Sequence, residues 1–164
     1  MIIGNKQYIS FEFKKTSSPQ EISTINFHLG GKLISGESTY LPTYVVQIEN
    51  FNQSVVDGRF SNPKLTKLTL EECFNKLVRE RNSDEDQYFD HLLLLDETID
   101  KYYIFAFQSN KSISFAWSCW DEHNCNDHHQ LNQIYSVQIP TAELNSVLTQ
   151  LCKELKNVLN GSRQ

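Results

Sequence analysis

Apolar and polar residues alternate along two runs near the start of the chain, 8–14 and 22–29. Successive side chains of a β-strand point to opposite faces, so each run is predicted to be a strand with one apolar face. Turn-forming residues at 16–19 connect the runs, which predicts an antiparallel pair. Gly30 and Gly31 then turn the chain into a short third strand over residues 32–35.

Helical spacing of apolar residues, three or four positions apart, replaces this alternation in three later segments, 41–53, 69–81 and 141–160. Pro42 stands in the first turn of the first segment, where proline is tolerated. Thr69 and Glu72 have the spacing of a capping box, which begins a helix. Gly161 follows the longest apolar stripe and is predicted to end the last helix.

Residues 101–120 form the segment around which the rest of the chain is predicted to be organised. Two runs rich in aromatic and β-branched residues flank the polar tetrad 109–112, which is typical of a β-hairpin. Pairing Ser109 with Ser112 gives one face that is predicted to be core: Tyr102, Ile104, Ala106, Phe115, Trp117 and Cys119. The other face carries Tyr103, Phe105 and Phe107 beside Ser114, Ala116 and Ser118. Three rings over small residues suit either a second covering layer or an exposed binding surface.

The remaining segments complete the order of elements: loops at 82–90 and 121–131, a buried strand at 91–95 and a last strand at 133–139. The strands occur in local groups and do not alternate with helices. This order predicts an α+β fold, an antiparallel β-sheet with helices packed on one face. A chain of 164 residues can bury a core of its own, so we expect a single domain, residues 1–164, that folds without metal.

The composition, with 39% apolar and 21% charged residues, is that of an ordinary globular protein. The N-terminal segment lacks the apolar stretch of a secretion signal, and the apolar runs are too short to cross a bilayer. We therefore expect a cytoplasmic protein without a membrane partner. In that reducing compartment Cys73, Cys119, Cys125 and Cys152 are expected to be free thiols, with Cys125 in its polar loop the fastest to react.

The net charge of −5 is unevenly distributed. Residues 84–127 contain ten acidic residues and two lysines, whereas the rest of the chain has more basic than acidic residues. Proteins that bind nucleic acid carry a basic face, so this pattern disfavours nucleic acid as a partner. It favours a basic protein partner, and an acidic surface that only maintains solubility is an equal alternative.

Zinc-type ligands gather in the loop after the hairpin, where Cys119, Cys125, His128 and His129 could meet. Their spacing matches no zinc motif, and Cys119 is also predicted to face the core. A zinc-dependent enzyme or a zinc-stabilised module on this loop is the alternative hypothesis. Residues 31–38 have the spacing of a phosphate-binding loop, but Glu37 replaces the lysine and would repel phosphate. No nucleophile motif accompanies these residues, so we expect neither catalytic residues nor a cofactor.

Five short motifs occur together along the chain: MIIG at 1–4, ISFEF at 9–13, FHLGGK at 27–32, LEECF at 70–74 and VQIP at 137–140. With the leucine-led helix that begins at Leu41, they resemble Immunity protein family 42 of bacterial polymorphic toxin systems. The resemblance implies a small cytoplasmic protein that binds and neutralises one cognate toxin, and it implies no catalytic residues.

An inhibitor of this kind is expected to occlude the active surface of its toxin with a few aromatic anchors and steering charges. Residues 84–100 contain seven acids and no base, with two aromatic residues among the charges. The predicted toxin-binding residues are Asp84, Glu85, Asp86, Tyr88, Phe89 and Asp90. They would suit a toxin with a basic active cleft, such as a nuclease. The protein is expected to be a monomer or weak dimer. A small-molecule-binding domain that uses the Tyr103, Phe105 and Phe107 face is a further alternative.

Overall fold

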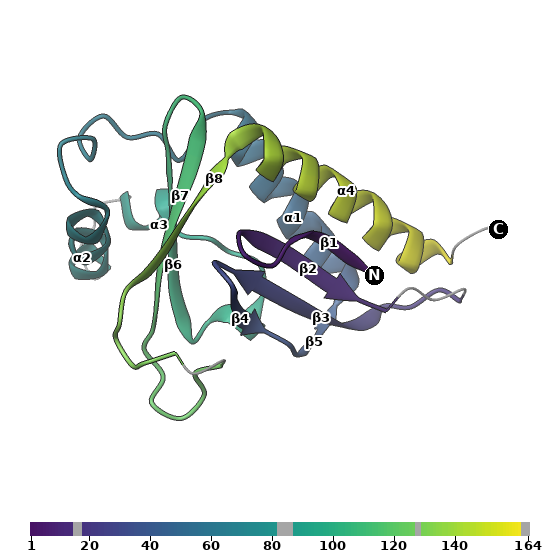
Figure 1. Ribbon diagram of the computed structural model, residues 1–164. Coiled ribbons are helices and arrows are strands. Elements are labelled where there is room, and N and C mark those ends of the chain that lie inside the picture. The colour runs from purple at the N-terminus through teal and green to yellow at the C-terminus, as the bar shows by residue number, and fades with distance from the viewer. Residues whose placement is uncertain (15–17, 82–86, 127–128, 162–164) are drawn as a thin grey trace.

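The computed structural model describes residues 1–14, 18–81, 87–126 and 129–161. In these residues eight strands form two antiparallel sheets and four α-helices pack against them (Figure 1), so the predicted α+β class is confirmed. The elements in chain order are β1 (Ile2–Asn5), β2 (Ile9–Phe13), β3 (Ile22–Leu29), β4 (Lys32–Ser35), β5 (Ser38–Tyr40), α1 (Leu41–Val56), α2 (Leu70–Glu80), α3 (Gln87–His91), the 3-10 turn η1 (Glu97–Ile99), β6 (Tyr102–Gln108), β7 (Ser112–Cys119), β8 (Tyr135–Pro140) and α4 (Thr141–Asn160).

The first sheet contains the strands that alternation predicts. Its order is β1-β2-β3-β4, and β5 pairs with the first residues of β3. Ile9, Phe11 and Phe13 are buried on the inner face of β2, and Phe11 stacks on Phe27 of β3 with ring centroids 4.9 Å apart. Strands β1 and β5 were not predicted, because each is too short to show an alternating pattern; β1 buries only Ile3.

The second sheet has the order β6-β7-β8, and the predicted hairpin register is confirmed. Tyr102 lies opposite Cys119 and Ile104 opposite Trp117, while the backbone N–H of Ser109 donates to the carbonyl of Ser112 at 2.8 Å. The predicted strand at 91–95 was wrong, since only Leu92 bridges to Phe105. The chain there runs beside the open edge of β6, forms one β-bridge with it, and then continues into η1.

Helices α1 and α4 lie side by side against both sheets (Figure 1). Their apolar stripes, which include Ile48 and Phe51 of α1 and Leu148 and Leu151 of α4, join the inner faces of both sheets in one continuous core. The predicted capping box of α2 is confirmed, because the Thr69 hydroxyl accepts from the N–H of Glu72 while the Glu72 carboxylate accepts from the N–H of Thr69.

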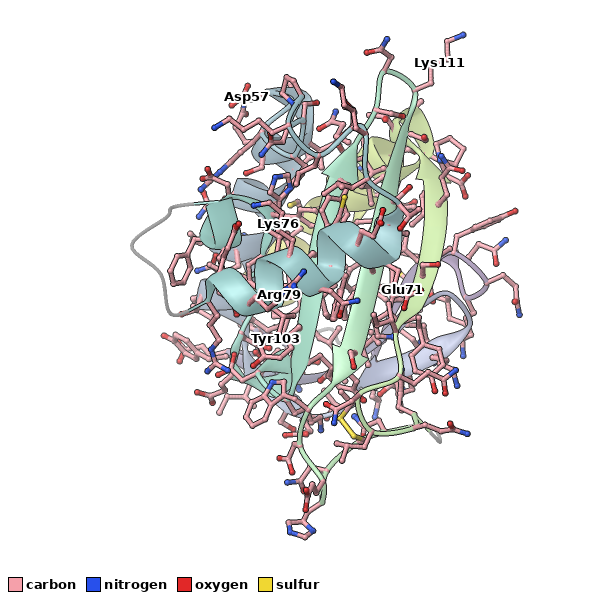
Figure 2. The ribbon with its side chains drawn as sticks, turned by 90° about the vertical axis from the view of Figure 1, so that its left-hand side faces the viewer. Asp57, Glu71, Lys76, Arg79, Tyr103 and Lys111 are labelled. Atoms are coloured by element: carbon pink, nitrogen blue, oxygen red, sulfur yellow. A yellow bond between two sulfur atoms is a disulfide. The ribbon has the colours of Figure 1, made fainter. Side chains whose placement is uncertain are left out.

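Helices α2 and α3 cover the other face of the second sheet, which differs from the predicted arrangement with helices on one face. Figure 2 shows α2 lying across the strands, with Glu71 and Arg79 on its outer side. Phe105 is completely buried there and packs edge-to-face against Phe74 of α2 and Tyr88 of α3. The small side chains of β7 leave room for these rings. The face proposed for a small molecule is therefore filled at its centre by the protein's own helices.

The buried histidine His91, at the end of α3, should make the stability of the protein depend on pH. Its Nδ1–H donates to the carbonyl of Ala106 at 2.8 Å, and its ring stacks on Phe107. Desolvation lowers the pKa of His91 from its ordinary value of 6.5. The unfolded chain thus binds a proton at a pH where the folded protein does not, so the free energy of unfolding should fall as the pH drops below about 6.5.

Urea unfolding at several pH values checks this effect. His91→Gln should make the curve flatter below about pH 6.5, whereas His123→Gln, at an exposed loop position, should preserve the wild-type slope. Equal slopes for wild type and His91→Gln would contradict the assignment.

Candidate functional site

A buried hydrogen bond attaches the loop after β7 to the core. The indole N–H of Trp117 donates to Nε2 of His129 at 3.0 Å, and both side chains are buried. Nδ1–H of His129 then donates to the carbonyl of Asn126. Asn126 is itself held, because its backbone N–H donates to the hydroxyl of Tyr102 at 2.8 Å and its side-chain amide donates to the carbonyl of Ile34 at 2.8 Å. The polar loop thus has fixed positions at 126 and 129.

A disulfide between Cys119 and Cys125 corrects the expectation of four free thiols. The expectation rested on the compartment, whereas the folded loop returns to the end of β7 and brings the two Cα atoms to 5.9 Å, within the range a disulfide requires. The free cysteines are Cys73, which is buried, and Cys152, which is half-buried. Burial raises the pKa of both thiols, which makes them slow to react.

The disulfide and the hydrogen bonds of His129 occupy three of the four residues of the alternative zinc site. Cys119 and Cys125 are bonded to each other and do not offer thiolates, and both ring nitrogens of His129 have hydrogen-bonding partners. His128 lies outside the described residues. Within the described part of the chain no three histidine, cysteine or acidic side chains converge as metal ligands.

The disulfide joins two cysteines that are six residues apart in the sequence. We expect it to stabilise the fold by about 2 kcal/mol, because it lowers the conformational entropy of the unfolded chain. Urea unfolding of the wild type with and without reductant should show this difference. The variant Cys119→Ala/Cys125→Ser should unfold at the same urea concentration in both conditions. Identical midpoints for oxidised and reduced wild type would show that the disulfide contributes nothing to stability.

Two adjoining hollows lie between α1, α3 and the segment that leads into β6. The first has a volume of about 400 Å³ and the second about 570 Å³, and they share the wall formed by Gln47, Leu92, Leu93 and Leu94. We call the surface formed by the linings of both hollows the leucine face. Phe89 and Asp90 line the first hollow, and Tyr103 and Trp120 line the second. Both hollows are open to the surface and are wide enough to receive protruding side chains of a partner.

Three large apolar side chains on the leucine face are exposed: Phe89 at 59%, Leu94 at 55% and Trp120 at 42% of their surface. Exposed apolar groups that follow one another along a groove are typical of a protein-interaction surface. Leu94 lines both hollows, whereas Phe89 lines only the first and Trp120 only the second. The leucine face is therefore the candidate functional site.

The residues predicted for toxin binding fall partly on this face. Phe89 is exposed, whereas Tyr88 beneath it is 6% exposed and contacts it edge-to-face with centroids 5.0 Å apart. A carboxylate oxygen of Asp90 lies 3.5 Å from the guanidinium of Arg59. Asp84, Glu85 and Asp86 lie outside the described residues.

Leu94, Trp120 and Arg59 belong to the leucine face but were not among the predicted site residues. Leu94 was assigned to a buried strand, and the strand pattern alone does not show that it points outward. A signal for Trp120 was available, because it continues the face of β7 that carries Ser114, Ala116 and Ser118 and is the large ring on that face. Arg59 comes from a distant part of the sequence, and only the fold brings it beside Asp90.

Comparisons with known proteins identify relatives of this chain and of its fold. The sequence model of the family described as Immunity protein 42 matches residues 1–154. Among solved structures, the fold is similar to that of CdiI from Burkholderia dolosa AUO158, with a TM-score of 0.65 and 17% sequence identity, covering 94% of this chain and 99% of that chain. A comparison with curated proteins gives no match. No helix within the described residues is long and apolar enough to span a membrane.

Proposed function

Because the chain belongs to the Immunity protein 42 family and is thus a toxin-neutralising immunity protein, we propose that it acts by occluding the active surface of one cognate toxin. The leucine face carries this proposal, since it combines adjoining hollows with exposed aromatic residues on a well-packed support. The buried histidines His91 and His129 hold the structure together through hydrogen bonds. Their engagement favours a binding role over catalysis.

Phe89 is the side chain best placed to enter a pocket on the toxin. Its ring projects from α3, and Tyr88 supports it while packing against Phe105, whose ring centroid lies 5.4 Å from that of Tyr88. An exposed ring that is already held in position loses little conformational freedom on binding. We assign Phe89 as the anchor and Tyr88 as its support. The charges of Asp90 and of the acidic residues Asp84, Glu85 and Asp86 are proposed to attract a basic toxin.

The proposed location is the cytoplasm, and the protein is proposed to act as a monomer or weak dimer. Disulfides are rare in that compartment, where reductants would open Cys119–Cys125 for part of the time. The contacts of Trp117 with His129 and of Tyr102 with Asn126 do not involve either sulfur. They would hold the loop near its place in both redox states.

Replacement of Phe89 by alanine tests the anchor. It should speed dissociation of the cognate toxin and weaken binding by about 1–4 kcal/mol, the range of an interface hot spot. Binding kinetics on the immobilised toxin domain measure this effect. Ile22→Ala, which shortens a side chain of similar exposure on β3, should leave both rates unchanged. A folded Phe89→Ala protein that binds like the wild type would place the anchor elsewhere.

Reversing the charge of the acidic residues 84–86 should change the association rate instead. Lysine at positions 84, 85 and 86 should slow association with a basic toxin and flatten its dependence on salt, because rim charges steer encounter more than they stabilise the complex. Stopped-flow association at several ionic strengths measures it. An unchanged salt dependence would exclude these three residues from the steering surface.

A further inference from the structure

The two ends of the leucine face differ in charge. At the Phe89 end, the charged lining of the first hollow consists of Asp57, Asp90 and Arg59, and Arg59 pairs with Asp90, so one carboxylate is in excess. At the Trp120 end, a further hollow of about 380 Å³ shares Asp100 and Trp120 with the second hollow. Its charged lining consists of four carboxylates and one lysine: Glu37, Glu97, Asp100, Asp121 and Lys101. This end therefore carries uncompensated negative charge.

The basic side chains of the face already have partners inside the protein. Lys101, whose side chain is mostly buried, forms an ion pair with Glu37 at 3.0 Å. Arg81 donates to the hydroxyl of Tyr103 and lies over its ring. Among the described residues, Glu97 and Asp100 make no side-chain hydrogen bond or ion pair, and both are exposed. Their charges are available to a cation from outside.

Trp120 presents its ring beside these carboxylates from a fixed backbone. Its N–H donates to the carbonyl of Lys101 at 3.1 Å, and the disulfide that begins at the preceding residue closes the loop around it. The ring packs against Tyr103 with centroids 6.2 Å apart and an angle of 34° between the planes. An aromatic group that is held in this way can receive a partner with little loss of freedom.

The arrangement fits a guanidinium better than a metal ion. Within the described residues these carboxylates do not converge as metal ligands. A guanidinium already lies on the adjacent ring, because the Cζ atom of Arg81 is 5.4 Å from the centroid of Tyr103. Guanidinium groups stack on indole rings and donate to carboxylates through several N–H groups at once, whereas an ammonium acts as a compact point charge.

We propose that the Trp120 end of the leucine face binds an arginine side chain of the toxin, which lies over the indole and donates to Asp100 and Glu97. This inference rests on the proposed function, because it identifies the chemistry of the toxin surface that the leucine face receives. Asp121 completes the acidic surroundings. The side chain of Asn124 and the N–H of His123 donate to its carboxylate and keep its pKa below the usual range, so it stays charged.

Binding kinetics with the cognate toxin domain test the proposal. Trp120→Ala should speed dissociation by about 10-fold or more, as for a central aromatic anchor. Glu97→Gln/Asp100→Asn should slow association severalfold at low salt and reduce its salt dependence. Tyr8→Ala, in the turn between β1 and β2, is the matched control for the ring, with a similar exposure of 41%. Glu21→Gln/Glu71→Gln, at two exposed positions, is the control for the acids.

Chemical modification of the toxin with phenylglyoxal, which reacts with arginine, tests whether the bound cation is an arginine or a lysine side chain. Wild-type protein should protect one toxin arginine, and Trp120→Ala should remove that protection. Protection of toxin lysines alone would overturn the assignment to arginine. The acid variant leaves the indole in place, so it tests the surface even if Trp120→Ala unfolds. If the wild type forms no complex, the proposed function fails. If the wild type binds and both variants bind like it, the Trp120 inference alone fails.

Discussion

The β6–β7 hairpin is apolar on both faces, and the need to cover both determines how the rest of the chain is arranged. One face places Phe115 and Trp117 in the main core against α1, α4 and the first sheet. The opposite face places Phe105 beneath α2 and α3. Full burial of each such side chain is worth about 1.5–3 kcal/mol, so a hairpin covered on only one side would lose several times that amount. The chain must therefore pass from one side of this sheet to the other between α1 and β6.

That passage creates the leucine face. After α3 the chain follows the open edge of β6, where Leu92 bridges to Phe105 and the N–H of Leu93 donates to the carbonyl of Ile104 at 2.8 Å. An edge strand covered in this way is protected against pairing with other chains. Leu93 and Leu95 turn inward, and the intervening Leu94 is left exposed. Asp96 then joins the segment to the first sheet by accepting a hydrogen bond from the hydroxyl of Thr39 in β5, and it begins η1 by accepting one from Thr98. The exposed apolar groups thus result from a segment with one buried side and one free side.

Much of the fold could be predicted from the sequence because it depends on local patterns. The register of the hairpin follows from its turn and its alternation, and α4 follows from one uninterrupted apolar stripe. The disulfide could not be predicted in this way, since the distance between Cys119 and Cys125 depends on how the loop folds back. The second covering layer of the hairpin could be stated only as one of two alternatives, because aromatic side chains beside small ones fit a helix and a binding partner equally well.

The acidic segment led to two residues of the leucine face, Phe89 and Asp90, but its pattern does not show which of the two aromatic rings is exposed. Tyr88 and Phe89 are neighbours on a helix of a single turn, so the sequence gives no periodicity from which to choose the buried one. Only contact with Phe105 distinguishes them. Trp120 was missed because its neighbours in space, Tyr103 and Asp100, are separated from it by the whole hairpin.

The unequal charge of the two ends of the leucine face favours one orientation of the bound toxin. Screening at physiological salt limits the reach of exposed charges to about 8 Å, so Glu97 and Asp100, which line the same hollow as Trp120, act mainly on a partner beside that ring. Asp90 contributes less attraction than these two carboxylates, because it is paired with Arg59. A toxin that approaches with an arginine toward Trp120 would therefore be oriented before its apolar surface reaches Leu94 and Phe89. On this view, charge sets the orientation of the complex and the aromatic anchors set its lifetime.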